Sequence, residues 1–346
     1  MRIGYSGLAI VLCASCALGQ APATDRVYNL SHTATAKDFQ ALTKLIVSVA
    51  KVNETSADEA QRTLSVTGTT NQIAVSDWLV KELDRDAPTN PAAQPRQDKA
   101  VHQYAASDDD MVRIFYFPLV GSIAGFQNIA TVVRNIVYIA NAYAYNPLRA
   151  IVVRDTSDQI ATAAWMVEQM AEAIQTGLMS ADEYRMPRVT DNVIRMYLAK
   201  SSDSIQTVAE IVTDIRSIGD IRRLFTAWAP DFAPEIVAMR GTNDQIALGD
   251  WLFQQLEQAS PVDKNTASIE YRMSEGAPEN VVRIFYLPRS LTVQKFQNVA
   301  QNLRTQTGVR RLFTYNAPRA LVVRGTPDQM NRVAELVQAS AVLASQ

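Results

Sequence analysis

The chain has 346 residues, of which 47% are hydrophobic and 20% are charged. This composition is typical of a globular protein and excludes an intrinsically disordered one. A net charge of −2, with arginines scattered along the chain, argues against a general affinity for nucleic acid or anionic lipid.

Residues 1–23 are expected to be a secretory signal peptide. Arg2 gives a positive start, an apolar stretch follows from Leu8 to Leu18, and small residues up to Ala23 offer a cleavage site. The apolar stretch is too short to span a bilayer. We therefore expect an exported chain, periplasmic or extracellular, with no transmembrane segment after cleavage. A lipoprotein anchored through Cys16 is the alternative.

Both cysteines, Cys13 and Cys16, lie inside this signal. The mature chain is therefore expected to contain no thiol. This excludes disulfides, thiolate nucleophiles and cysteine-ligated metals together.

The chain contains an internal repeat. Residues 66–74 recur as 153–161, 239–247 and 323–331, and the Gln within each segment lies 87, 86 and 84 positions after the previous one. A second anchor lies upstream of each Gln, at Tyr28, Tyr116, Tyr197 and Tyr286. Two anchors at one period predict four tandem copies of one unit of about 85 residues.

Each copy is predicted to be a β-α-β-β-α module. In the fourth copy, residues 281–287, 311–315 and 320–323 are expected strands, one helix begins at Thr292 and the other follows Gly325. The fold class is α+β, with a small sheet and two helices on one of its faces. The expected bounds are 1–23 for the signal, 24–85 for module 1, 86–99 for a linker, and 100–176, 180–258 and 266–346 for modules 2 to 4. Copies 2 to 4, but not the first, are expected to carry an additional strand at their start.

The repeated Gly-Thr-x-x-Gln segment predicts a helix start. The Gly is expected to take a left-handed turn, the Thr hydroxyl caps the helix, and the Gln reaches back to the Thr N–H as in a capping box. The second copy has Asp155 in place of the Gly. Anion binding at the same helix N-terminus is the alternative, although no phosphate-loop Lys accompanies the segment.

This arrangement resembles the N-terminal repeat modules of secretins, which are βαββα domains with a KH-like shape. The resemblance is carried by an apolar strand that ends in Gly, as in residues 321–325, and by the helix from Ile73 to Leu83 that ends in Leu83-Asp84. It implies a protein-interaction or ring-forming module in the bacterial envelope. Secretins also carry a large β-rich pore domain, and the chain stops about 20 residues after Gly325, so pore formation is not carried over.

No residue pattern predicts a catalytic, cofactor or metal site. His32 and His102 have no equivalents in other copies, and residues 108–110 (three Asp) lack the spacing of a calcium loop. No Gly-x-x-Gly loop lies between helices, so RNA binding is not expected. We expect a protein that is not an enzyme.

Three tryptophans recur at one position. Trp78, Trp165 and Trp251 each lie six residues after the capping Gln, and helical spacing directs them away from the apolar face of their own helix. The fourth copy has Glu335 there. We expect each Trp to pack against the linker or the next module, whereas the last module has no successor. An exposed partner-binding site and burial within the module are the alternatives.

Two further features are candidate contacts. Arg223 and Arg311 open equivalent strands and carry the bidentate donor that suits carboxylates; a solvated sheet face is the alternative. Residues 228–234 lengthen the hairpin of the third copy and place Trp228 and Phe232 in an inserted loop. A locally folded loop tip is the alternative there.

The sequence thus favours a non-enzymatic scaffold or interaction protein of the bacterial envelope, an accessory of a secretion or pilus assembly. Its expected partners are proteins, among them a secretin, and self-association into a homo-oligomer is left open. An envelope hydrolase or carbohydrate-binding protein with a site between modules is the alternative from another functional class. A monomer that docks onto a true secretin is a third.

Overall fold

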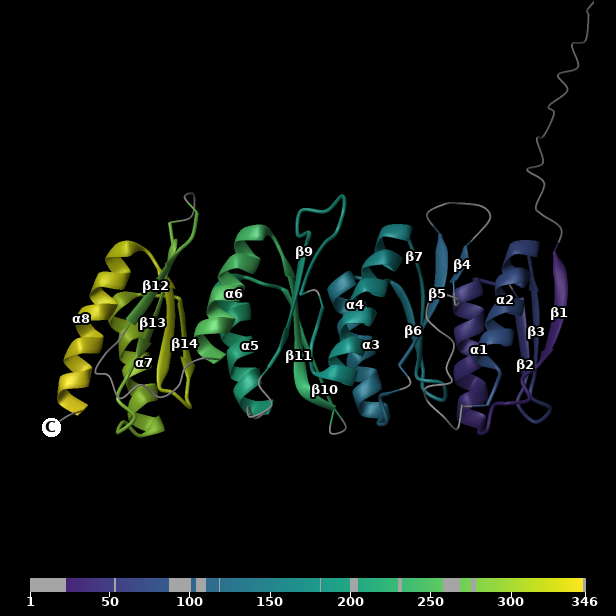
Figure 1. Cartoon of the computed structure of the whole chain (residues 1–346), viewed down its shortest axis with the longest axis horizontal. Coiled ribbons are helices and arrows are strands. Elements are labelled where there is room, and N and C mark those ends of the chain that lie inside the picture. Colours follow the sequence, from purple (N-terminus) through teal and green to yellow (C-terminus); the bar gives the residue numbers. More distant parts are fainter. Residues whose placement is uncertain are drawn as a thin grey trace, which may run out of the picture. The chain divides into compact units, whose positions relative to one another are not determined.

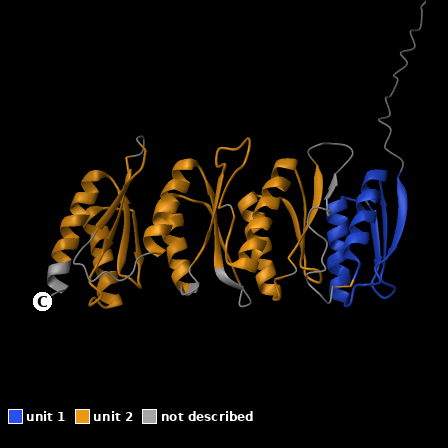
Figure 2. Ribbon diagram, viewed as in Figure 1, with its two compact units in different colours: residues 1–85 blue, residues 86–346 orange. Residues whose placement is uncertain are grey.

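The computed structural model describes residues 23–52, 54–86, 101–103, 110–117, 119–180, 182–199, 205–229, 232–257, 268–274 and 278–344. Most of the expected signal and linker lie outside these residues. The chain divides into two compact units, residues 1–85 and residues 86–346 (Figure 2). No helix among the described residues is both long enough and apolar enough to cross a membrane.

Residues 1–85 hold one βαββα module. Its elements are β1 (Thr24–Asn29), α1 (Ala36–Ala50), β2 (Glu54–Asp58), β3 (Thr63–Gly68) and α2 (Thr70–Leu83). The antiparallel sheet has the order β1-β3-β2. Leu64 and Val66 of β3 are buried and alternate with half-buried residues, because successive residues of a strand face opposite sides of the sheet.

Residues 86–346 hold three such modules, each with one additional strand (Figure 1). The second module consists of β4 (Val101–Gln103), β5 (Met111–Tyr116), α3 (Ile123–Val137), β6 (Asn141–Tyr145), β7 (Ala150–Asp155) and α4 (Ser157–Thr176). The third consists of β8 (Glu183–Arg185), β9 (Val193–Leu198), α5 (Ile205–Gly219), β10 (Arg223–Ala229), β11 (Phe232–Gly241) and α6 (Asn243–Glu257). The fourth consists of β12 (Ser268–Arg272), β13 (Val281–Tyr286), α7 (Val293–Thr307), β14 (Arg311–Tyr315), β15 (Ala320–Gly325) and α8 (Pro327–Ala344).

The three sheets share one topology. Their strand orders are β4-β5-β7-β6, β8-β9-β11-β10 and β12-β13-β15-β14, and every pairing is antiparallel. The expected α+β fold is therefore confirmed. The additional strand precedes modules 2, 3 and 4, and no such strand precedes β1 among the described residues.

Strand register corrects one of the two repeat anchors. Tyr28 lies opposite Leu64 in β3, and Tyr197 holds the equivalent place opposite Val237. In the other copies that place belongs to Phe115, opposite Ile151, and to Phe285, opposite Leu321. Tyr116 and Tyr286 lie one residue further along and face the opposite side of the sheet. Two of the four tyrosines are therefore out of register with the other two.

The predicted capping box forms in modules 1, 3 and 4, but the Gly has a different role from the expected one. The N–H of Thr242 donates to Gln245 Oε1 at 3.0 Å, and the Gln245 N–H donates to the Thr242 hydroxyl at 3.3 Å. The left-handed turn was wrong, because the positive-φ glycines are Gly177 and Gly308. At Gly241, an added Cβ would instead lie 2.9 Å from Gln245 Oε1, so the Gly leaves room for the Gln side chain in its capping position.

Candidate protein-interaction site

In residues 86–346, the helices of one module pack on the sheet of the next. Helix α3 contacts β10 and β11, α4 contacts β11, and α5 contacts β14 and β15 (Figure 1). One continuous apolar cluster joins Val132 and Ile136 of α3 to Ile194 and Met196 of β9. An equivalent cluster joins Ile211 of α5 to the sheet of the fourth module. The α3 and α4 layer and helix α5 therefore each help to bury two sheets.

A buried arginine at the end of a strand anchors each of these contacts. Arg240 is the penultimate residue of β11, and its Nη1 donates to the carbonyl oxygens of Ile136 and Val137 at 3.1 and 3.0 Å. Arg324 holds the equivalent place in β15 and donates to the carbonyl of Ile218 at 2.7 Å. These carbonyls belong to the last turns of α3 and α5, where unpaired acceptors and the helix dipole favour a cation.

An acidic residue before the first long strand of the module completes the anchor. Asp191 Oδ1 accepts from Arg240 Nη2 at 3.0 Å, and the Asp191 carbonyl accepts from Arg240 Nε at 2.8 Å. Burial lowers the pKa of the Arg240 guanidinium, and the Asp191 carboxylate opposes that shift. The guanidinium stays charged, since its ordinary pKa lies far above neutral pH.

The two predicted arginines lie beside these anchors. Arg223 pairs with Asp191 at 2.8 Å and lies 4.5 Å from the centroid of the Tyr138 ring, at the C-terminal end of α3. Arg311 pairs at 2.6 Å with Asp220, which directly follows α5. Each arginine thus reaches the preceding module, once through an aromatic ring and once through a carboxylate.

Two of the three recurring tryptophans, Trp165 and Trp251, lie at the same boundaries. Trp165 of α4 lies 5.2 Å from Tyr184 of β8, and Trp251 of α6 lies 5.3 Å from Tyr271 of β12, measured between ring centroids. Each pair joins a helix to the additional strand of the next module. Trp78 is half-buried on α2. Glu335 is exposed on α8.

The lengthened hairpin of the third module extends as two strands, β10 and β11, with a register shift between Ala227 and Ala229. The Trp228 side chain is 37% exposed, while its backbone carbonyl accepts from Asn128 Nδ2 of α3 at 2.6 Å. Phe232 begins β11, and its side chain lies outside the described side chains.

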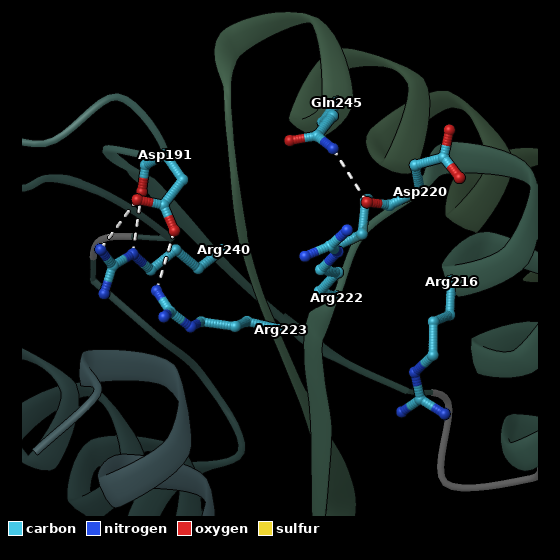
Figure 3. Close-up of a pocket in the computed structure, with 8 residues that line it drawn as sticks. Asp191, Arg216, Asp220, Arg222, Arg223, Arg240 and Gln245 are labelled. Carbon is cyan, nitrogen blue, oxygen red and sulfur yellow. Dashed lines mark hydrogen bonds and ion pairs between the residues drawn. The ribbon is translucent and has the colours of Figure 1, made fainter. Parts of the chain in front are cut away.

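An arginine-rich cleft of about 1120 Å³ opens in the third module (Figure 3). Asp191 holds Arg223 and Arg240 on one side, and Gln245 donates to the Asp220 carbonyl on the other. Arg222 is exposed at the cleft. Four arginines and two aspartates are among the residues that line the cleft, so the cleft suits an acidic group. The lining residues are Asp191, Arg216, Asp220, Ile221, Arg222, Arg223, Arg240 and Gln245.

A carboxyl is buried at the boundary between the third and fourth modules. Asp214 of α5 is 2% exposed, and its Oδ2 accepts no hydrogen bond within the described part of the chain. Burial, with a smaller contribution from Glu210, raises the pKa of Asp214 to about 8. Both residues line a 250 Å³ pocket that also includes Arg304 and Phe313. At neutral pH Asp214 is therefore largely protonated.

A further polar cluster lies within single modules. The Tyr197 hydroxyl donates to Asp250 Oδ1, which also accepts from Arg195 Nε at 3.1 Å. In the first module Arg26 pairs with Asp77 at 3.1 Å in the equivalent place. Burial and Asp250 raise the pKa of Tyr197 above its ordinary range. These groups satisfy one another, which indicates a structural role.

The buried arginines were missed by the sequence reasoning, although a signal was present. Arg154, Arg240 and Arg324 occur one residue before the Gly or Asp of the capping segment, whereas the first copy has Thr67. A charged residue inside a buried apolar strand requires a partner. In the second module Arg154 pairs with Asp110 at 2.6 Å.

Comparisons with known proteins give no family for the chain. No family model and no curated protein matches it. A solved structure of ExeD from Aeromonas hydrophila, a secretin-family protein, is similar at 14% identity, over 69% of this chain and 42% of that one, with a TM-score of 0.16. The crystal structure of aspartate kinase from Synechocystis is similar at 10% identity, over 88% and 52%, with a TM-score of 0.18. The matches span about half of each of those chains or less. TM-scores this low carry no argument about function.

Within the described residues, no group of three His, Cys, Asp or Glu side chains is arranged to hold a metal ion.

Proposed function

We propose that the protein is a non-enzymatic scaffold of the bacterial envelope, exported after signal cleavage, that binds other proteins as an accessory of a secretion or pilus assembly. The observation that carries this proposal is the pair of equivalent contacts Trp165–Tyr184 and Trp251–Tyr271. Both join one module to the next, so recognition of one module by another is built into the chain. The resemblance of the modules to secretin N-terminal repeats supports the same proposal.

The surface offered to a partner is the exposed part of the third module. Trp228 presents a partly exposed indole at the lengthened hairpin, and Arg222 presents an exposed guanidinium at the cleft. Aromatic and arginine side chains are the types that most often dominate protein interfaces. An acidic protein surface with an apolar centre is the partner that this chemistry fits.

A photo-crosslinking amino acid at position 228, in cells of the native host, tests the proposal. The matched control carries it at Gln301, which is exposed on the polar face of α7. We expect a discrete adduct with an envelope protein from position 228 and none from position 301. The mass of the recovered chain reports signal cleavage near Thr24. An uncleaved chain in the cytoplasm, with no adduct at either position, would contradict the proposal.

The solution mass of the chain from Thr24 separates two forms of the scaffold. A large, discrete oligomer in light scattering would show that the modules assemble among themselves. A monomer at micromolar concentration would favour docking onto another envelope protein.

A further inference from the structure

One edge of the first sheet differs from its counterparts in the other modules. Strand β1 pairs with β3, and no strand lies on its other edge within the described residues. In the other three modules that edge is filled, because β4, β8 and β12 pair antiparallel with β5, β9 and β13. The same fold thus accepts a strand at this edge three times within one chain.

The side chain that receives the added strand is present in β1. Arg26 lies opposite Val66, and this register makes it the equivalent of Arg195 in β9 and Arg283 in β13. The added strands place Glu183 and Glu270 directly opposite those arginines.

The added strands pair with these arginines through ion pairs and also bury their side chains. Glu270 accepts from Arg283 Nε at 2.9 Å, and Glu183 lies 3.4 Å from Arg195. The side chains of Arg195 and Arg283 are 21% and 19% exposed, whereas that of Arg26 is 57% exposed. Arg26 is the equivalent of these two arginines, and no added strand lies opposite it among the described residues.

The neighbours of Arg26 indicate which other side chains an added strand would carry. Val27 is 65% exposed and corresponds to Ile284, which lies opposite Ile269 of β12. Asp25 corresponds to Val282, which lies opposite Tyr271. An apolar residue would therefore cover Val27, and a basic or hydroxyl-bearing residue would suit Asp25.

We propose that the β1 edge binds an extended segment of a protein partner by antiparallel strand addition. The segment carries, in order, an apolar residue opposite Val27, an acidic residue opposite Arg26 and a basic or hydroxyl residue opposite Asp25. Backbone hydrogen bonds supply affinity in this mode, and alternate side chains supply specificity. A second β1 does not fit this pattern, because its one acidic residue, Asp25, follows Thr24 and not an apolar residue. This inference rests on the proposed function and names a partner segment for it.

A labelled peptide tests the site on the full chain. The probe has the sequence of residues 266–274, with Tyr271→Lys so that a Lys lies opposite Asp25. We expect saturable binding by fluorescence anisotropy and slower amide exchange over residues 24–29. A probe with Glu270→Lys should bind at least about ten-fold weaker, which is about 1.4 kcal/mol. Arg26→Glu in the protein should weaken the first probe similarly and restore binding of the second.

Two controls isolate the edge. Glu54→Lys, on the opposite edge strand β2, should leave binding of both probes unchanged. A probe N-methylated on the amides that face β1 should not bind, because it lacks the strand donors. Thermal unfolding of the Arg26→Glu chain confirms that it folds, since Arg26 and Asp77 are both largely exposed.

Several results would overturn the inference. These are no binding at millimolar probe, equal binding of the N-methylated probe, or protection of β2 instead of β1. Protection of β1 that grows with protein concentration would assign the edge to a second copy. A ten-fold gain in affinity on removal of residues 1–22 would assign it to the chain itself. Crosslinking at position 228 is independent of this edge, so failure here leaves the proposed function standing on its own test.

Discussion

The Nη1 of Arg240 donates to the carbonyl oxygen of Val137 across a boundary between two modules, at 3.0 Å. A strand end in one module thereby satisfies the last turn of a helix in the module before it. Arg324 makes the same kind of bond to Ile218. Hydrogen bonds as well as apolar packing therefore join these successive modules.

Arg240→Met should destabilise residues 86–346 by about 3 kcal/mol, because it leaves Asp191 and two helix-end carbonyls without their buried partner. Denaturant unfolding followed by tryptophan fluorescence measures the change. Arg222→Met is the matched control, since Arg222 is exposed at the same cleft, and it should change stability by less than about 0.5 kcal/mol. Equal effects of the two variants would contradict the anchor role.

Asp214 should make stability depend on pH. Its folded-state pKa of about 8 lies above the unfolded value, so the folded chain binds this proton more tightly. The stabilisation is complete below about pH 4 and is lost as the pH rises through about 8. Asp214→Asn should remove this dependence of stability on pH. At pH 9 the variant should be more stable than the wild type by several kcal/mol, since each unit of pKa shift corresponds to about 1.4 kcal/mol.

Urea unfolding of both chains at pH 5 and pH 9 checks this expectation. Asp214→Val provides a second variant, because Val132 occupies the equivalent position of α3. Parallel pH profiles for the wild type and Asp214→Asn would show that the carboxyl is not buried as the structure places it.

Trp251→Ala should cost about 2 to 3 kcal/mol, because it removes a half-buried indole from the contact with Tyr271. A double-mutant cycle with Tyr271→Ala should give a coupling energy of about 0.5 to 1.5 kcal/mol. Trp228→Ala is the control, since the Asn128 amide bonds the backbone carbonyl and not the indole of that residue. A coupling energy near zero would mean that the two rings are neighbours without energetic contact.

Gly241→Ala should cost only about 1 kcal/mol, since the Gln245 side chain can turn away from the added methyl group. The second module shows that outcome: Asp155 Oδ1 accepts from the Thr156 N–H at 2.9 Å, and Gln159 Oε1 accepts from the Thr156 hydroxyl at 2.8 Å. Amide exchange at Thr242 should become faster. Unchanged exchange would show that the capping bond survives the substitution.

The βαββα order and the additional strands could be predicted from the sequence because each depends on local patterning. Val281 to Tyr286 is recognisable as a strand by its β-branched and aromatic residues alone. The capping segment was recognisable for the same reason, since its Thr and Gln act within one helix turn.

The anchors could not be read in this way, because their partners lie about a hundred residues away. Arg324 bonds a carbonyl 106 positions earlier, and a backbone carbonyl carries no sequence signature. The one-residue shift of Tyr116 was hidden as well, because Phe115 and Tyr116 are both aromatic and only strand pairing separates their faces.

The shared helix layers have a consequence for how the chain comes apart. Because α3 and α4 supply the core beneath β5 and β7 and also cover β9 and β11, loss of one module strips a neighbour of part of its own interior. We expect unfolding of residues 86–346 to begin at one end and to spread across the module boundaries. When the molecule is pulled from its two ends, we therefore expect its length to increase in one large step. Three modules that unfolded independently would give three separate steps.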